Sequence, residues 1–204
     1  MSDRSRSPLD ALERAQEETY FHKKDQALIE AMRHKLDRER NADAIRQETG
    51  IADDALVTRL AELGVDRDTI PVLHLAPLLQ VAWADGEIQG GERDLLLEAA
   101  TATGLTEGPA RARFEEMLQR RPEQAWFDAA LDFIRHMLAA LPEGQADAAR
   151  GNLEDLAWRV ADASGGVFGL WGRVEDAEKD ALRNIATRLT AGRGDAASKL
   201  LGKL

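Results

Sequence analysis

The stretch from His74 to Thr103 decides the fold, and it reads HLAPLLQVAWADGEIQGGERDLLLEAATAT. Its first half repeats apolar side chains at three- and four-residue spacing: His74, Leu75, Leu78, Leu79, Ala82 and Trp83. This spacing places one broad apolar face on a helix. Gly86 suits the left-handed conformation that ends such a helix, and a second apolar helical run begins at Glu92. The stretch therefore predicts a tight helix–turn–helix with acidic residues at the turn.

The totals of the chain exclude several classes of protein. The net charge is −10 over 204 residues, which argues against a nucleic-acid platform, because phosphate binding needs clustered lysine and arginine. The absence of cysteine excludes disulfides, thiolate metal sites and cysteine nucleophiles. No apolar run resembles a signal peptide or reaches membrane-spanning length. We therefore expect a cytoplasmic protein that does not insert into membranes.

Helical periodicity recurs along the chain, and no alternating β-branched run appears, so we expect an all-α fold. Residues 1–49 form a long, charged N-terminal helix, residues 50–190 an all-helical domain, and residues 191–204 a C-terminal tail. Within the domain, a helix is expected to start at Asp66 or Asp68 and to be kinked by Pro77, which lies several residues inside it.

The N-terminal helix is predicted to meet a partner protein or a second copy of the chain. Its apolar side chains form a thin stripe at four- and seven-residue spacing: Phe21, Leu28, Met32 and Leu36. Such a stripe is narrow for a core helix and is typical of a helix that lies on a partner or pairs with itself. Tyr20 and Phe21 are adjacent aromatics on an otherwise polar helix. We assign partner binding to Tyr20, Phe21, Leu28 and Met32.

The second half of the domain repeats the first. The paired positions are Asp85 with Asp162, Gly86 with Gly172, Ile88 with Val174, and Glu92 with Glu178. The second copy has a glycine-rich insertion at 163–171. Each copy reads as helix, acidic turn, helix, and two such hairpins packed face to face would bring both turns to one end of the domain.

The two turns supply a candidate metal site made of carboxylates: Asp85, Glu87, Glu92, Asp162 and Glu178. Oxygen ligands alone suit Ca²⁺, Mg²⁺ or Mn²⁺. The spacing is not that of an EF-hand, since Glu92 follows Asp85 by only seven positions. The alternative is that these acids cap the helices that follow them, because helix N-termini favour negative charge without any metal. Both interpretations remain open at this point.

No catalytic constellation can be assembled from the sequence. None of the four histidines lies at ligand spacing from another, and His136 is expected to be solvated on the polar side of its helix. No Ser–His–Asp or Glu-x-x-His pattern appears. We therefore expect a protein that is not an enzyme.

The segment VAWADGEIQGGERDLLLEAA, Val81 to Ala100, resembles the signature of the tellurite-resistance TerB-like family. The family motif is an Ala-Asp-Gly-x-Ile turn followed by Glu-Arg on the next helix, and the resemblance extends over about residues 71–189. It implies an all-helical bundle of two helix–acidic turn–helix hairpins. It also implies a bacterial stress-response module of the tellurite or metal resistance type, which binds a divalent ion, a partner protein, or both through its acidic turns.

The N-terminal helix has a second, shorter resemblance. Glu17-Glu18-Thr-Tyr20-Phe21, followed by Ile29 and Met32, is similar to the inhibitory helix of the mitochondrial ATPase inhibitor protein. The histidine-rich coiled coil that follows in that family is missing here. This resemblance implies an alternative function, a regulatory inhibitor or adaptor whose first helix docks on a larger complex such as an ATPase.

Overall fold

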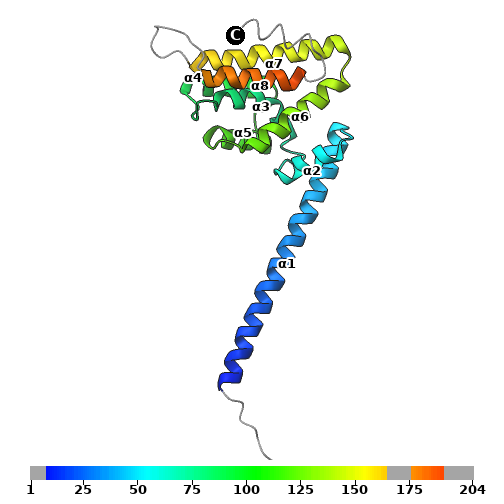
Figure 1. Ribbon diagram of the computed structural model, residues 1–204, viewed down its shortest axis with the longest axis vertical. Coiled ribbons are helices and arrows are strands. Elements are labelled where there is room, and N and C mark those ends of the chain that lie inside the picture. Colours follow the sequence, from blue (N-terminus) through cyan, green and yellow to red (C-terminus); the bar gives the residue numbers. More distant parts are fainter. Residues whose placement is uncertain (1–7, 165–175, 191–204) are drawn as a thin grey trace, which may run out of the picture. The chain divides into compact units, whose positions relative to one another are not determined.

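A computed structural model describes residues 8–164 and 176–190 of the chain (Figure 1). Within these residues the elements are eight α-helices and one short 3₁₀ helix, without any strand. The predicted all-α helical bundle is confirmed. The chain divides into two compact units, Met1–Arg40 and Asn41–Leu204, and the second is called the body below.

Helix α1 covers Pro8–Thr49, and its last turns belong to the body. Ala42 and Ile45 are both buried in the hydrophobic core, and Ile45 has no exposed surface. The helix ends at Gly50, which has a positive φ of 68° and donates its backbone N–H to the carbonyl of Arg46 at 2.9 Å. The boundary between the two compact units, after Arg40, therefore lies inside α1, before the expected boundary after residue 49.

The start of the body differs from the expected long, kinked helix. Helix α2 covers Asp54–Glu62 and is capped by Asp53, whose Oδ1 accepts the Leu56 N–H at 3.1 Å. A 3₁₀ helix, η1, then covers Ile70–Leu75, and α3 covers Ala76–Ala82. Pro77 therefore lies in the first turn of a new helix, where its missing N–H leaves no bond unmade. Instead of a kink inside one α-helix, the structure has a 3₁₀ helix that leads directly into α3.

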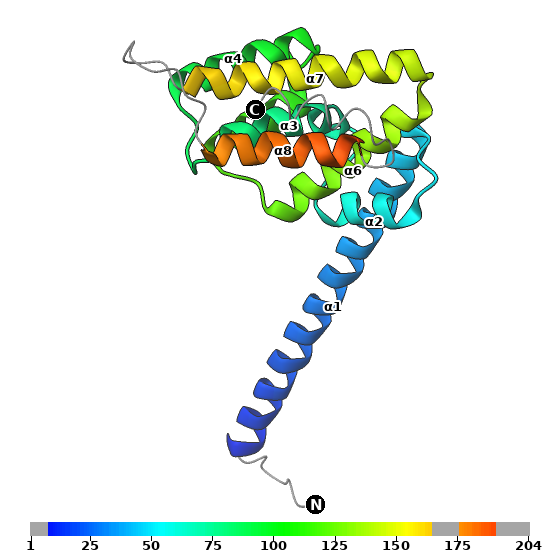
Figure 2. The same cartoon turned by 45° about the horizontal axis from the view of Figure 1, so that its top comes forward.

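Helix α3 forms the centre of the body, and all of its residues are buried. It packs against α6, Gln124–Ala140, and against α7, Glu143–Ser164, and α8, Asp176–Thr190. Figures 1 and 2 show α7 and α8 side by side and antiparallel over α3. The remaining helices are α4, Gly90–Ala102, which packs against α7, and α5, Gly108–Gln119, which packs against η1.

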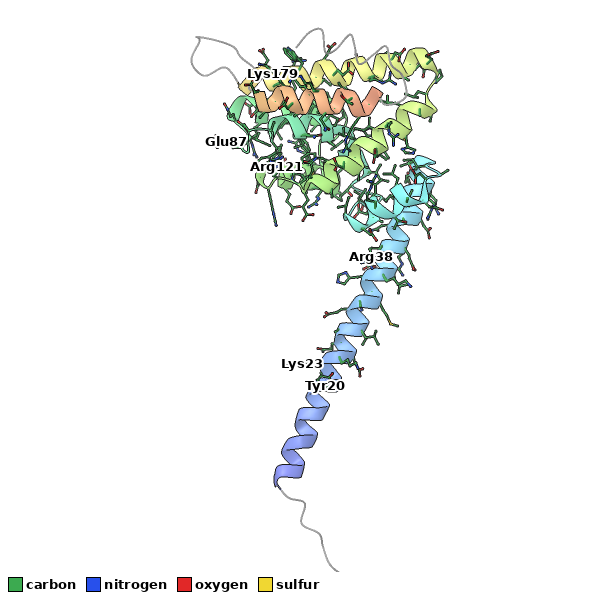
Figure 3. The ribbon with its side chains drawn as sticks, in the orientation of Figure 1. Tyr20, Lys23, Arg38, Glu87, Arg121 and Lys179 are labelled. Carbon is green, nitrogen blue, oxygen red and sulfur yellow. The ribbon has the colours of Figure 1, made fainter. Side chains whose placement is uncertain are left out.

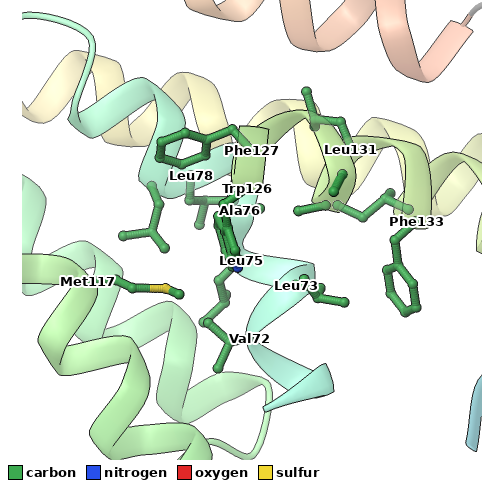
Figure 4. Close-up of a cluster of buried hydrophobic side chains, with 14 of the residues drawn as sticks. Val72, Leu73, Leu75, Ala76, Leu78, Met117, Trp126, Phe127, Leu131 and Phe133 are labelled. Atoms are coloured by element: carbon green, nitrogen blue, oxygen red, sulfur yellow. The ribbon is translucent and has the colours of Figure 1, made fainter. Parts of the chain in front are cut away.

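The core is formed largely by aromatic and branched side chains of α6 and the η1–α3 segment (Figure 4). Phe127, Leu131 and Phe133 of α6 have almost no exposed surface. Met117 of α5 points toward the same cluster in Figure 4. The Trp83 indole N–H donates to the Met117 carbonyl at 3.0 Å, so the end of α3 is tied to α5 by a buried hydrogen bond.

Candidate functional site

In the first acidic turn, the side chain of Asp85 makes a hydrogen bond to the backbone of the same turn. Its Oδ1 accepts the backbone N–H of Glu87 at 3.1 Å, which is the local contact that aspartate makes in turns. Both side chains are exposed, and Figure 3 shows Glu87 at the end of the body where α7 stops and α8 starts. Gly86 has a φ of 104°, a conformation that disfavours any side chain.

Glu92 is buried, with 1% of its surface exposed, in the first turn of α4. Its Oε2 accepts the backbone N–H of Gln89 at 2.7 Å. This contact is the glutamate half of a capping box, in which the third residue of a helix satisfies the N–H of the residue that precedes it. Glu92 therefore stabilises the start of α4 by its own hydrogen bonding.

The second copy places a glutamate at the same helical position. Glu178 is the third residue of α8, as Glu92 is of α4, and it too is 1% exposed. Asp162 lies exposed in the last turn of α7. Gly172 and Val174, the other two paired positions, lie outside the described residues, as does most of the glycine-rich insertion.

The five predicted ligands thus divide by exposure. Glu92 and Glu178 are buried, whereas Asp85, Glu87 and Asp162 are exposed. Among the residues that the structure describes, no three histidine, aspartate or glutamate side chains are grouped so as to hold a metal ion. The chain between Asp162 and Glu178 falls mostly outside them, and the divalent-ion site stays a prediction.

Three of the four α1 residues that are predicted to bind a partner have exposed side chains: Tyr20, Leu28 and Met32. Tyr20 is 63% exposed, Leu28 is 56% and Met32 is 58%, and the neighbouring Ile29 and Leu36 are 48% and 52%. The side chain of Phe21 lies outside the described ones. Large apolar side chains exposed in a group mark interaction surfaces more often than single ones do.

No pattern in the sequence predicts one charged contact of the body. His136, expected to be solvated, lies between α6 and the residue that caps α2. Its Nδ1 lies 2.8 Å from the Asp132 carbonyl oxygen on the same helix, and its Nε2 lies 3.4 Å from Asp53 Oδ2. A carbonyl oxygen accepts only, so Nδ1 carries the hydrogen, and Nε2 can donate to Asp53 only when the ring is protonated. No spacing rule links two residues so far apart in the chain.

The pKa of Asp53 lies below its ordinary value. The main cause is the backbone N–H of Leu56, which donates to the carboxylate and favours its charged form, and the nearby His136 acts in the same direction. The cap of α2 is therefore strongest when Asp53 is ionised.

The body contains a cleft of about 450 Å³, which no pattern in the sequence predicts. It lies between the end of α2, the end of α5 and the connection that leads into α6. Its walls carry three arginines and three glutamates: Arg113, Arg120, Arg121, Glu62, Glu116 and Glu123. Residues this far apart in the chain meet only through the fold.

Comparison with known proteins identifies no relative. No protein-family model matches the chain, and neither do any of the curated proteins or the solved structures. The TerB-like and ATPase-inhibitor resemblances therefore stay predictions. Within the described part of the chain, no helix combines the length and the apolar character that crossing a membrane requires.

Proposed function

We propose that the chain is a non-enzymatic interaction module that docks a partner protein through α1. The observation that carries the proposal is a set of half-exposed apolar side chains on one helix face, called the apolar stripe: Leu28, Ile29, Met32 and Leu36. Each exposes 48–58% of its surface, so contact with a partner would remove apolar area from water. Tyr20 is rotated by about 80° from Leu28 and by about 180° from Ile29, so it lies outside this stripe.

The charges around the apolar stripe favour a partner of different composition over a second copy. At about 100° per residue, four basic residues border the stripe on its two sides: Lys24 and Lys35 on one, Arg33 and Arg40 on the other. Two copies meeting along the stripe would bring these like charges together, which disfavours pairing. The Lys35–Glu39 contact at 3.8 Å and the Arg40–Asp37 contact at 3.9 Å are both exposed and offset little of this repulsion. The expected partner therefore presents an apolar groove with an acidic rim.

The proposed docking of a partner on the apolar stripe can be tested by site-specific photo-crosslinking in the cells that make the protein. A photoreactive amino acid at Met32 should give a discrete adduct, and Ile29→Ser should abolish it. The matched control replaces His34, which lies about 160° away from Met32 around the helix. Equal adducts from both positions, or none from Met32, would count against docking through the stripe. Light scattering of the purified chain should give a monomer mass.

The two resemblances indicate what kind of partner to seek. The TerB-like segment supports a place in a bacterial stress response, and the ATPase-inhibitor-like helix supports docking on a larger complex. If that complex is a rotary ATPase, the full chain should slow its ATP hydrolysis, and the double variant Ile29→Ser, Met32→Ser should not. Equal inhibition by both chains would contradict this.

A divalent-ion site at the acidic turns is the second candidate. It is favoured by the exposure of Asp85, Glu87 and Asp162, which leaves three carboxylates accessible to an ion. Calorimetric titration of the metal-stripped protein with Ca²⁺, Mg²⁺ and Mn²⁺ tests it. Binding that is lost in the double variant Asp85→Ala, Asp162→Ala, with the fold retained, would establish the site. No heat from any of the three ions would exclude it.

A further inference from the structure

The cleft beside α5 combines an apolar floor with a charged rim. Its apolar residues are Leu63 from the end of α2, Met117 from α5, and Pro122 and Trp126 at the start of α6. Met117 and Trp126 are each 4% exposed, so the floor is fixed by core packing. A volume of about 450 Å³ lies within the range of sites that hold small ligands or short peptide segments.

Four charges on the rim have no partner of opposite sign within the described part of the chain. Arg113 is paired with Glu116 on its own helix. Among the described residues, no opposite charge lies within 4.0 Å of the four others: Arg120, Arg121, Glu62 and Glu123. Most arginines of the body do have such a partner, as Arg59 has in Asp132 and Arg188 in Asp128. The cleft thus offers two open positive and two open negative groups.

The sign pattern of these groups restricts the ligand. A phosphate or a dicarboxylate would meet Arg120 and Arg121 but would also face Glu62 and Glu123, which repel it. A purely cationic ligand would be repelled by the arginines in the same way. A ligand that carries both signs can pair with all four groups. The planar guanidinium of each arginine also favours a carboxylate, which it can bind through two hydrogen bonds.

We propose that this cleft binds a peptide segment carrying one acidic and one basic side chain. The acidic side chain pairs with Arg120 and Arg121 on the α5–α6 connection, where Figure 3 marks Arg121. The basic side chain pairs with Glu62 and Glu123, and the aliphatic parts between them lie over Trp126 and Met117. This site lies wholly in the body and is independent of the apolar stripe of α1.

Nuclear magnetic resonance titration of the full chain tests the proposal. The probes are capped tripeptides with one lysine and one glutamate, in both orders, beside a tripeptide with two glutamates, one with two lysines, and inorganic phosphate. The mixed-charge peptides should cause saturable shifts of the Trp126 indole N–H and of the backbone amides of residues 62–64 and 120–123. The peptides of a single sign and phosphate should bind at least about tenfold more weakly, because two pairs of charges are lost.

Two double variants separate the halves of the site. Arg120→Gln with Arg121→Gln should lower affinity for the mixed-charge peptides about tenfold, as should Glu62→Gln with Glu123→Gln. The matched control is Arg93→Gln with Arg159→Gln, since these arginines also have no described carboxylate within 4.0 Å but do not line the cleft. It should leave affinity unchanged. Equal affinity in all three variants, tighter binding of phosphate than of the peptides, or no saturable shift would each overturn the proposal.

Discussion

A buried acidic side chain needs hydrogen bonds to replace the water it has lost, and Glu92 has such a bond to the backbone. It is 1% exposed and accepts the Gln89 N–H at 2.7 Å. Glu92→Ala should therefore lower the free energy of unfolding by about 2 kcal/mol, the cost of a lost cap and an unmet buried N–H. Urea unfolding in the presence of a chelator would measure this.

The control for that prediction is Asp94→Ala, an exposed acid two residues further along the same helix, which should change stability by less than about 0.5 kcal/mol. If Glu92→Ala were neutral in chelator and destabilising only when a divalent ion is present, the residue would be a metal ligand instead of a cap.

Asp53 makes the stability of the body depend on pH. Because its pKa is lower in the folded chain than in the unfolded one, its contribution is present above the unfolded pKa, about 4. That contribution is lost as the pH falls through the unfolded and then the folded pKa. Asn can cap a helix but cannot ionise. The melting temperature of Asp53→Asn should therefore lie below that of the parent at pH 7 and approach it at pH 3.

The outcome that would contradict this is a difference in melting temperature between parent and Asp53→Asn that stays constant from pH 7 to pH 3. Such a result would show that Asp53 does not stabilise the body through its charge.

At the scale of the elements, a hydrogen bond from the buried indole of Trp83 connects the end of α3 to α5. Trp83 is mostly buried and donates to the Met117 carbonyl, so Trp83→Phe removes both volume and a buried donor. We expect a loss of about 2 kcal/mol in the free energy of unfolding. Trp158→Phe is the control, because Trp158 is 40% exposed and should change stability by less than about 0.5 kcal/mol. Similar losses from both variants would contradict this.

The sequence predicts helices well where apolar spacing and helix-ending glycines agree. It does not predict a helix boundary near a proline, because proline can lie in the first turn of a helix or kink its interior. Gly86 has a positive φ, as its position after the first apolar run indicates. Pro77 is expected to kink a longer helix, but it lies in the first turn of α3, which accepts proline without losing a bond. Local pattern alone does not distinguish these two placements.

The candidate sites differ in the same way: those within one stretch of sequence can be predicted, and those formed between distant stretches cannot. Leu28 and Met32 are exposed, as a stripe too narrow for a core helix indicates, while their binding to a partner stays a prediction. The Asp53–His136 contact and the charged cleft depend on how α2, α5 and α6 pack, which no pattern in one stretch reports. The equal burial of Glu92 and Glu178 supports the internal repeat that is predicted from paired positions in the two halves of the sequence.

At the scale of the whole molecule, the boundary between the two units makes a sharp prediction about truncation. Residues 1–40 contribute no side chain to the described core, whose first members are Ala42 and Ile45. A chain that starts at Asn41 should therefore unfold cooperatively, with a free energy of unfolding within about 0.5 kcal/mol of that of the full chain. It should also lose every partner contact made through the apolar stripe.

A chain that starts at Ile51 should behave differently, because it lacks Ile45, which has no exposed surface, and the ion pair of Arg46 with Asp54. Removing one fully buried isoleucine and its neighbours should cost about 3 kcal/mol. Urea unfolding of the three chains, followed by circular dichroism, would compare them. If the chain from Asn41 were as unstable as the chain from Ile51, the first forty residues would have to support the body directly, and α1 could not serve as a docking helix that leaves the fold unchanged.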